Sequence, residues 1–283
     1  MECFTLYQQG VALLSKCGIV DAELESSLLL AVILDVPRST ILLDLKTCSP
    51  SEVERFESFI SRRCQHEPFA YIVGFQEFWS LDFKVTPDVL IPRPETELII
   101  EHITHLFGPD VFCGRVLDCG TGSGILPITL ATIYPQATFM ACDISEQALV
   151  VARENSERHS VSKRLTFFRA DFMQPLHVPH AFDLIVSNPP YVDASTFSTL
   201  QDDVVQFEPH LALDGTGDGF VIVEHLLRTL PAHLQAGGHL FMEIGFDQQQ
   251  RAEDVLRSLP IYGQYKVHVD YAGLPRMIHA VKR

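Results

Sequence analysis

A glycine-rich segment near the middle of the chain directly follows a short apolar run. The run Arg115–Asp118 leads into Gly120-Thr121-Gly122-Ser123-Gly124, and a predicted helix, Ile125 to Tyr134, stands behind it. Glycines let the backbone turn tightly and approach a ligand at the carboxyl end of a sheet. The G-x-G-x-G spacing fits neither the G-x-G-x-x-G dinucleotide fingerprint nor the phosphate-binding loop, which would need a lysine. The segment therefore predicts a ligand-binding loop that favours neither NAD nor ATP.

Acidic and aromatic residues end the next two predicted strands. Asp143 ends the second strand, where a carboxylate can accept hydrogen bonds from both hydroxyls of a ribose. The third strand is followed by Asp171 and Phe172, an acceptor and an aromatic face suited to an adenine ring. Because the carboxyl ends of parallel strands share one edge of a sheet, these side chains are expected beside the glycine loop. Strand-end acids are also ordinary loop residues, so Asp171 or Phe172 alone decides nothing.

The fourth predicted strand runs into Asn188-Pro189-Pro190-Tyr191. Two prolines fix the backbone and remove two N–H donors, which leaves carbonyls and the Asn188 amide as a rigid set of acceptors beside an aromatic ring. A planar NH2 group needs such a partner, because a conjugated nitrogen is a poor nucleophile. Hydrogen bonds from its two N–H groups to Asn188 and to the Pro189 carbonyl would aim its π face at an electrophile bound beside the glycine loop. Catalysis would then depend on orientation and need no covalent nucleophile.

The elements that must position these residues fall into three parts. Residues 1–73 are predicted to form an N-terminal helical domain: Ser49-Pro50-Ser51-Glu52 is a capping box before apolar residues at helical spacing, and Asp21 is expected to cap an earlier helix. Aromatic and β-branched residues with Pro87, Pro92 and Pro94 predict a β-hairpin and a proline-rich connector over 74–94. Residues 95–283 alternate between predicted helices and strands.

The alternation predicts the fold class. Short apolar runs separated by helical segments imply parallel pairing through crossover helices, and the short link between the last two strands forces an antiparallel hairpin. We expect an α/β fold with a mostly parallel sheet and an antiparallel last strand. The seven predicted strands of this sheet are Arg115–Asp118, Thr138–Asp143, Leu165–Arg169, Leu184–Ser187, His239–Ile244, Tyr265–Asp270 and Met277–Val281.

Composition excludes several classes of protein. A hydrophobic fraction of 47% with 20% charged residues is globular, and the longest apolar run, Leu28–Leu34, is far too short to span a bilayer. The net charge of −15 disfavours long contact with a phosphate backbone. Seven cysteines without a paired spacing are expected to be reduced thiols in a cytoplasmic protein, and the twelve histidines show no metal-site spacing, so we assign no metal.

An acidic residue, G-x-G-x-G and a further acid ending the next strand together resemble the class I S-adenosyl-L-methionine-dependent methyltransferases, whose fold is Rossmann-like. The resemblance implies S-adenosyl-L-methionine as cofactor, with S-adenosyl-L-homocysteine as product. It places Gly120 to Gly124 around the methionine part and Asp143 on the ribose, with Phe172 and Asn188 also at the cofactor. The Asn-Pro-Pro-Tyr motif resembles that of enzymes that methylate amide or exocyclic amino nitrogens. Its chemistry does not separate a glutamine amide from an adenine amino group.

More of the chain resembles the glutamine-N5 methyltransferases that modify peptide chain release factors, the PrmC/HemK family. The likeness is carried by Glu77-Phe78-Trp79, by the segment from Val89 to Glu97, by Phe207-Glu208-Pro209 and by the AGLPR near the end. It implies that the substrate is the glutamine of the Gly-Gly-Gln (GGQ) loop of bacterial class 1 release factors. Asn188, Pro189, Pro190 and Tyr191 would hold that glutamine as catalytic and substrate-binding residues, and residues 1–73 would recognise the factor.

Some positions and alternatives stay open at this point. Arg93 and Glu97 are interpreted as supports of the site or as a salt bridge that locks the connector, and Phe207-Glu208-Pro209 either lines the substrate entrance or forms a surface turn. Cys119 stands where the family has a leucine, and Phe172 where an aromatic, often Trp, is expected. An N6-adenine methyltransferase and a non-catalytic cofactor-binding scaffold are the alternatives. We expect no nucleic acid partner, because the sequence shows no helix-turn-helix, zinc finger or basic arm, and no membrane partner, because no apolar run is long enough.

Overall fold

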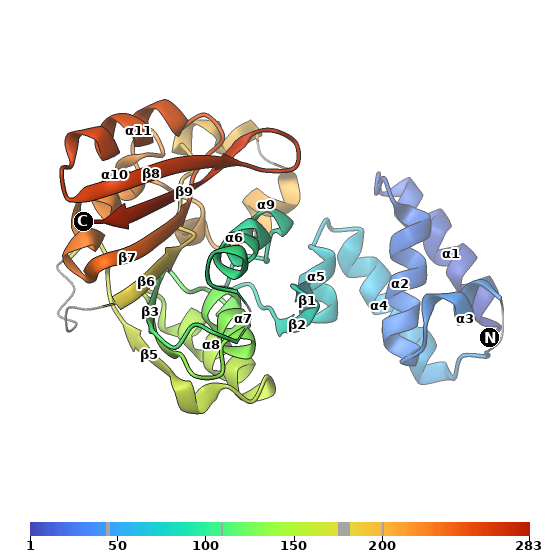
Figure 1. The fold of residues 1–283 in the computed structure, drawn as a ribbon. Helices are drawn as coiled ribbons and strands as arrows, with labels where there is room; N and C mark the ends of the chain where they lie inside the picture. Colours follow the sequence, from blue (N-terminus) through green and yellow to red (C-terminus); the bar gives the residue numbers. More distant parts are fainter. Residues whose placement is uncertain (44–45, 109, 175–181, 200) are drawn as a thin grey trace. The chain divides into compact units, whose positions relative to one another are not determined.

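The computed structural model describes residues 1–43, 46–108, 110–174, 182–199 and 201–283, which separate into two units (Figure 1). The N-terminal unit is Met1–Phe75 with Gln201–Phe207, and the C-terminal unit is Gln76–Leu200 with Glu208–Arg283. Within these described ranges, no helix has the length and apolar character that a bilayer crossing needs. The candidate site residues of the sequence all lie in the C-terminal unit, apart from Phe207.

The N-terminal unit is helical, as the sequence predicts. The predicted capping box is confirmed, because the Ser49 hydroxyl accepts from the Glu52 N–H while the Glu52 carboxylate accepts from the Ser49 N–H. The cap expected at Asp21 is wrong: this residue precedes the second helix, but its side chain makes no capping hydrogen bond. The helices are α1 (Cys3–Lys16), α2 (Ala22–Leu34), α3 (Arg38–Leu42), α4 (Pro50–Arg63), α5 (Phe69–Val73) and α9 (Asp202–Phe207).

A disulfide joins Cys17 to Cys64, so the expectation that every cysteine is a reduced thiol is wrong for this pair. The two residues follow the last turns of α1 and α4, and packing of these helices brings their Cα atoms within 5.3 Å. The sequence separation of 47 residues carries no signal for such a contact, because the contact arises only from tertiary packing. Cys3, Cys48, Cys113, Cys119 and Cys142 are free thiols.

The C-terminal unit begins with the predicted hairpin. Strands β1 (Phe75–Phe78) and β2 (Leu81–Lys84) pair as a separate two-stranded sheet, and Trp79 and Ser80 turn the chain with φ of 53° and 59°. The proline-rich connector then leads to the short 3-10 helix η1 (Pro94–Thr96) and to α6 (Glu97–Phe107). The further 3-10 helices are η2 (Ser162–Arg164), η3 (Ala194–Thr199), η4 (His210–Ala212) and η5 (Leu230–Ala232).

Seven strands form the main sheet in the order β5-β4-β3-β6-β7-β9-β8. The first five strands of that order pair in parallel, whereas β9 runs antiparallel between β7 and β8, so the predicted fold class is confirmed. Each of the seven predicted strands is present, with ends that differ from the prediction by a few residues. The strands are β3 (Arg115–Cys119), β4 (Thr138–Asp143), β5 (Leu165–Arg169), β6 (Phe182–Ser187), β7 (Leu234–Glu243), β8 (Tyr262–Val269) and β9 (Pro275–Lys282).

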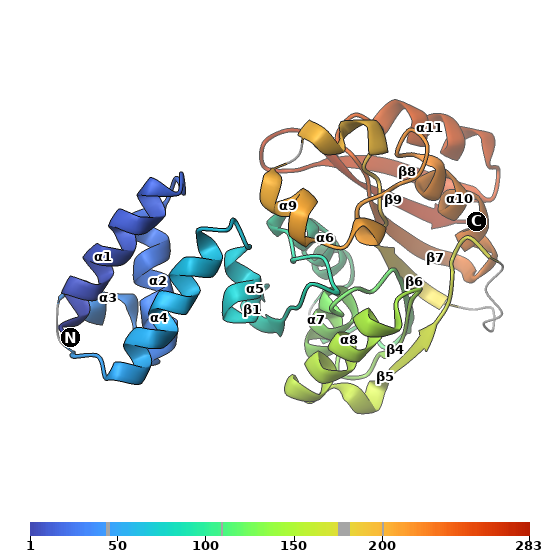
Figure 2. The same cartoon turned by 180° about the vertical axis from the view of Figure 1, so that it is seen from behind.

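Helices cover both faces of this sheet (Figures 1 and 2). Successive residues of a strand point to opposite faces, so Val116 packs in one apolar cluster and Leu117 in the other. The first cluster includes residues of α6 and of α7 (Ile125–Ile133), and α8 (Glu146–Arg158) lies beside α7. The second includes residues of α10 (Val221–Thr229) and α11 (Gln249–Ser258). Apolar burial on two faces thus holds the sheet and leaves its carboxyl edge for polar residues.

The strand order reverses between β3 and β6. From β3 the chain proceeds through β4 to β5 on one side, and from β6 to β7 on the other. Ligands of open α/β sheets bind in the crevice at such a switch point, outside the carboxyl ends of the strands. The glycine loop follows β3 and the Asn-Pro-Pro-Tyr segment follows β6, so the fold brings these two motifs to the switch point.

Four histidines from separate elements gather on the face of the sheet under α6. His239 Nδ1 lies 2.9 Å from His279 Nε2, the rings of His102 and His268 are 4.1 Å apart, and Phe241 stacks on His279. Burial, reinforced by the neighbouring charged or ionisable groups, lowers the pKa of His268 and of His279 to about 4. The cluster is therefore neutral in the folded protein at neutral pH.

This cluster predicts a loss of stability in mild acid. Between the unfolded pKa of about 6.5 and the folded value near 4, the unfolded chain binds protons that the folded chain does not. The contribution of this cluster to the free energy of unfolding should fall by about 2 kcal/mol between pH 7.5 and pH 5, after allowance for partly exposed rings. Urea titrations should show a smaller fall for His279→Gln than for His105→Gln, the matched control on the exposed face of α6. Equal pH dependence in both variants would contradict the assignment.

Candidate active site

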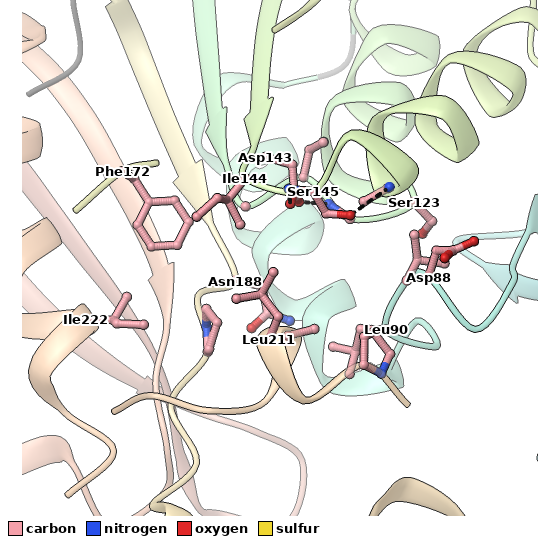
Figure 3. Close-up of a pocket in the computed structure, with 18 of the residues that line it drawn as sticks. Asp88, Leu90, Ser123, Asp143, Ile144, Ser145, Phe172, Asn188, Leu211 and Ile222 are labelled. Atoms are coloured by element: carbon pink, nitrogen blue, oxygen red, sulfur yellow. Dashed lines mark hydrogen bonds between the residues drawn. The ribbon is translucent and has the colours of Figure 1, made fainter. Parts of the chain in front are cut away.

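A cavity of about 530 Å³ lies at the carboxyl edge of the sheet (Figure 3). Its walls come from the segments that follow β3, β4, β5 and β6, and from two further stretches, residues 88–93 and 209–216. This volume lies in the range of small-molecule sites. The predicted residues that line it are Gly120, Thr121, Gly122, Ser123, Asp143, Phe172, Asn188 and Pro190.

The glycine loop wraps tightly around the end of β3. Gly120, Gly122 and Gly124 have φ of 76°, 54° and 85°, in the left-handed region that disfavours other residues. The N–H groups of Gly120 and Thr121 both donate to the Cys142 carbonyl of the neighbouring strand, at 2.9 and 3.0 Å. A Cβ on Gly124 would lie 2.7 Å from the Ile128 side chain, so this glycine is also required by packing and does not itself line the cavity.

Asn155 of α8 ties the loop to the β-hairpin. Its buried side-chain amide donates to the carbonyls of Ser123 and Lys84, and its oxygen accepts from the Lys84 N–H. Both the nitrogen and the oxygen of the Asn155 amide are therefore hydrogen-bonded. The hairpin that the sequence places before the domain therefore supports the glycine loop directly.

Asp143 is held by two backbone N–H groups. One carboxylate oxygen accepts from Gly122 and the other from Ser145, both at 2.9 Å, and Figure 3 shows the group at the cavity wall beside Ser145. Burial raises the pKa of the Asp143 carboxyl, while the backbone hydrogen bonds oppose that rise. Each oxygen keeps a further lone pair, so the carboxylate can still accept from a ligand hydroxyl.

Asp118 carries an unsatisfied carboxyl at the base of the cavity. Among the described residues, neither of its oxygens nor the Thr121 hydroxyl has a hydrogen-bond partner, and all three atoms are buried. Burial raises the pKa of Asp118 to about 7; the nearby Thr121 hydroxyl opposes the rise without completing a regular hydrogen bond, and the neighbouring Asp143 adds to it. A buried acceptor without a partner costs free energy, and a ligand ammonium group would satisfy it.

The aromatic residue expected at the third strand end is in place. Phe172 follows β5, is 9% exposed, and presents its ring to the cavity in Figure 3, near Ile222 and Ile144. Asp171 also lines the cavity, with one carboxylate oxygen accepting from the Met173 N–H at 2.9 Å. The ring offers a flat apolar face for an aromatic base.

The Asn-Pro-Pro-Tyr segment is divided in its exposure to the cavity. Asn188 and Pro190 line it, and Asn188 Nδ2 donates to Thr96 Oγ1 at 3.1 Å. Pro189 is buried and does not line the cavity. Tyr191 does not line it either: its hydroxyl donates to Glu243 at 2.8 Å, and its ring packs on the apolar cluster of α10 and α11. The sequence pattern could not show which of these four side chains face the cavity and which point away from it.

Arg93 and Glu97, whose roles the sequence left open, both support the structure around the cavity, and Arg93 also lines it. Arg93 lines the cavity and forms a salt bridge of 2.5 Å with Glu208, whose other oxygen accepts from the Ile91 N–H. Glu97 accepts from the Trp79 N–H at 2.7 Å. The salt-bridge interpretation therefore holds for Arg93, and the connector is locked to the residues before η4.

Several lining residues were missed by the sequence reasoning. Asp88, Leu90, Leu211 and Ile222 all face the cavity in Figure 3, and only Leu90 belonged to a segment that the sequence singled out. Leu211 is 57% exposed, a large apolar side chain at the cavity rim. A single residue in a loop, or one position of a helix such as Ile222 of α10, carries no sequence pattern, so only the folded chain identifies it. In the described part of the chain, no group of three or more His, Cys, Asp or Glu side chains could hold a metal ion.

Two family descriptions and several solved structures match the chain. The methyltransferase small domain matches residues 94–267, and the PrmC N-terminal domain matches residues 5–74. The hMettl16 catalytic domain, solved with a MAT2A 3′UTR hairpin, aligns with a TM-score of 0.57 at 14% identity over 83% of this chain and 81% of that one. A methyltransferase from Pyrococcus furiosus aligns with a TM-score of 0.53 at 18% identity, over 72% and 90%. The fold is that of a class I methyltransferase.

Relatives at higher identity narrow this class. The release factor glutamine methyltransferase of Moorella thermoacetica is 39% identical over 97% of this chain and 96% of its own length. That of Cereibacter sphaeroides is 37% identical over 99% and 98%, and that of Koribacter versatilis 40% identical over 80% and 79%. The chain belongs to the release factor glutamine methyltransferase family, and the resemblance seen in its sequence is confirmed.

Proposed function

We propose that this protein transfers the methyl group of S-adenosyl-L-methionine to the side-chain nitrogen of the glutamine in the GGQ loop of class 1 release factors. The observation that carries the proposal is the position of Asn188. It lines the same cavity as the glycine loop and Asp143, and a Cβ on Gly120 would lie only 3.8 Å from the Asn188 carbonyl. A substrate nitrogen held at Asn188 thus lies beside the cofactor site.

The residues of the cavity fit this cofactor. Asp118 offers an unpartnered buried carboxyl for the amino group, Asp143 offers both oxygens for the ribose hydroxyls, and Phe172 offers a face for the adenine. Gly120, Thr121, Gly122 and Ser123 surround the space left for the methionine part. When bound, the cofactor supplies an electrophilic sulfonium methyl group and is released as S-adenosyl-L-homocysteine.

The protein then has to orient the amide nitrogen. Asn188 Oδ1 accepts one of its N–H groups. The carbonyl that joins the buried Pro189 to the cavity-lining Pro190 accepts the other, and the two bonds direct the π face toward the methyl. The N–C bond would form as the bond between the sulfonium sulfur and the methyl group breaks, and one N–H proton would pass to solvent. Acceptors on the N–H groups stabilise the positive charge that develops on the nitrogen before the proton leaves. Pro190 narrows the cavity beside the amide, whereas Tyr191 acts on the segment from behind.

The N-terminal unit is proposed to recognise the release factor, which would place the protein in the cytoplasm. Several apolar side chains of its helices are exposed, including Phe4 (37%), Leu13 (48%), Leu24 (41%) and Val32 (47%). An apolar side chain gains nothing from contact with a phosphate backbone, whereas contact with a protein partner can bury it. The net charge of −15 favours the same choice, so an N6-adenine activity on nucleic acid is not favoured.

Methyl-labelled cofactor tests the reaction and the acceptor together. Parallel reactions contain an unmodified class 1 release factor, its Gly-Gly-Gln→Gly-Gly-Ala variant and duplex DNA, and peptide mass spectrometry locates the label. Label is expected on the glutamine of the native factor alone. Label on adenine would show that the acceptor is wrong while the methyl transfer stands, and no label anywhere would support a non-catalytic scaffold.

Two substitutions should separate catalysis from cofactor binding. Asn188→Ala removes the acceptor for the substrate amide, so kcat should fall by about 100-fold or more with little change in cofactor Kd. Asp143→Ala should weaken cofactor binding by roughly 1.5–3 kcal/mol, because it removes hydrogen bonds to a charged group. Calorimetry with S-adenosyl-L-homocysteine and single-turnover rates measure both quantities. Unchanged turnover in the first variant, or an unchanged Kd in the second, would remove that residue from its assigned role.

Recognition by the N-terminal unit has its own test. Deleting residues 1–73 should raise the KM for the release factor by about tenfold or more, while the Kd for S-adenosyl-L-homocysteine stays within about twofold. Leu13→Asp, at an exposed position of α1 in the full-length chain, tests the same surface and should raise this KM in the same direction without changing that Kd. Unchanged affinity for the factor in the deletion variant would leave the unit a purely structural role.

A further inference from the structure

Asn188 is tied to a buried carboxylate through one intervening hydroxyl. Its Nδ2 donates to Thr96 Oγ1 at 3.1 Å, and Thr96 Oγ1 donates to Glu243 Oε2 at 2.7 Å. Glu243 ends β7 and is 1% exposed, and Thr96 is fully buried at the start of α6. The second oxygen of Glu243 accepts from the Tyr191 hydroxyl at 2.8 Å. Both ends of the Asn-Pro-Pro-Tyr segment are therefore tied to the Glu243 carboxylate, Tyr191 directly and Asn188 through Thr96.

The direction of this chain of hydrogen bonds is fixed by its chemistry. Thr96 has a single hydroxyl proton, and a carboxylate can only accept, so that proton goes to Glu243. Thr96 Oγ1 is then an acceptor toward Asn188, and only the nitrogen side of the Asn188 amide can donate to it. Asn188 Oδ1 is left for the cavity, as the acceptor that a substrate NH2 group requires.

We infer that Thr96 and Glu243 are positioning residues, which select the orientation of the Asn188 amide and so make the site accept an NH2 group. The inference rests on the proposed function and adds two residues that do not line the cavity. If the amide were turned over, its own NH2 would face the substrate NH2, and no hydrogen bond could form. The two orientations of an amide are otherwise nearly equal in shape.

A cation supports the charge on Glu243. Burial raises the pKa of Glu243, and the hydrogen bonds from Thr96 and Tyr191 together with the nearby Arg276 of β9 limit that rise. Asp270 fixes Arg276 with hydrogen bonds to Nε and Nη2 at 3.3 and 3.2 Å. A buried, paired carboxylate remains an acceptor, and a protonated one would release Thr96 from its fixed direction.

The AGLPR segment acquires a role from this arrangement. Asp270 closes the β8–β9 turn by accepting from the N–H groups of Ala272 and Leu274, at 2.9 and 3.0 Å. The same carboxylate binds Arg276, the last residue of that segment. The hairpin at the sheet end thus places a cation behind the Asn-Pro-Pro-Tyr segment, although none of its residues lines the cavity.

The test compares Thr96→Val with Thr96→Ser in the full-length protein. Valine keeps the shape and removes the hydroxyl, so kcat for the release factor should fall by about 10- to 100-fold while KM and the Kd for S-adenosyl-L-homocysteine stay within about twofold. Serine keeps the hydroxyl and should retain kcat within about threefold. Glu243→Gln can donate to Thr96 as well as accept, so it should also lower kcat, by about tenfold.

Matched controls separate orientation from folding. Thr129→Val is the same change at a buried threonine of α7 whose hydroxyl has no partner in the described chain, and it should leave kcat unchanged. Thermal unfolding of every variant shows whether it is folded. If Glu243→Gln does not fold, the comparison of Thr96→Val with Thr96→Ser decides the test. Full kcat in Thr96→Val, or equal losses in Thr96→Val and Thr96→Ser, would overturn the inference. Absence of glutamine methylation by the unmodified protein would instead overturn the proposed function.

Discussion

The parallel pairing of β3 with β6 is the constraint on which the site depends. Register places Cys119 opposite Ser187, and the Ser187 hydroxyl donates to the Cys119 carbonyl at 2.7 Å, so both strands end side by side. The chain must leave them at one edge, where no apolar layer covers the backbone. The glycine loop and the Asn-Pro-Pro-Tyr segment are the two ways in which the chain departs. Their proximity is a property of topology, and no direct side-chain contact between the two motifs is needed to produce it.

Buried carboxyl groups around this edge differ in how they are satisfied, and the differences match distinct tasks. Backbone N–H groups hold Asp143, hydroxyl groups and a nearby guanidinium hold Glu243, and no described group makes a regular hydrogen bond to Asp118. A backbone partner cannot move, so Asp143 presents a fixed acceptor. A carboxyl without a partner is costly until a ligand donor arrives, and its burial raises the pKa of Asp118 to about 7. Ligand binding can therefore recover what folding leaves unsatisfied at this position.

Local patterns in the sequence predicted what local physics determines. The capping box at Ser49, the alternation of strands and helices, and the glycine loop follow from hydrogen bonds and backbone angles within a few residues, and all three are confirmed. Contacts between distant segments were outside its reach: the Cys17–Cys64 disulfide, the His239–His279 pair and the direction of the Tyr191 side chain arise from packing of elements far apart in the chain. Resemblance supplied the family, but it gave Thr96 and Arg276 only as members of motifs. The roles of Thr96 and Arg276 follow only from their contacts in the folded chain, with Asn188 and Glu243 for Thr96 and with Asp270 for Arg276.

An asparagine alone cannot discriminate an NH2 group from a carbonyl, because rotation of its amide exchanges donor for acceptor. Discrimination requires a neighbour whose own hydrogen-bonding direction is fixed, and a hydroxyl becomes such a neighbour only when its proton is committed elsewhere. A carboxylate is the protein group that commits it without offering a proton in return. Placing that carboxylate away from water is unfavourable, and it needs other donors and a cation nearby to remain ionised. At Glu243, Thr96, Tyr191 and Arg276 oppose the rise in pKa that burial causes. Motifs at opposite ends of the C-terminal unit are thus linked by the requirement that one amide oxygen face the substrate.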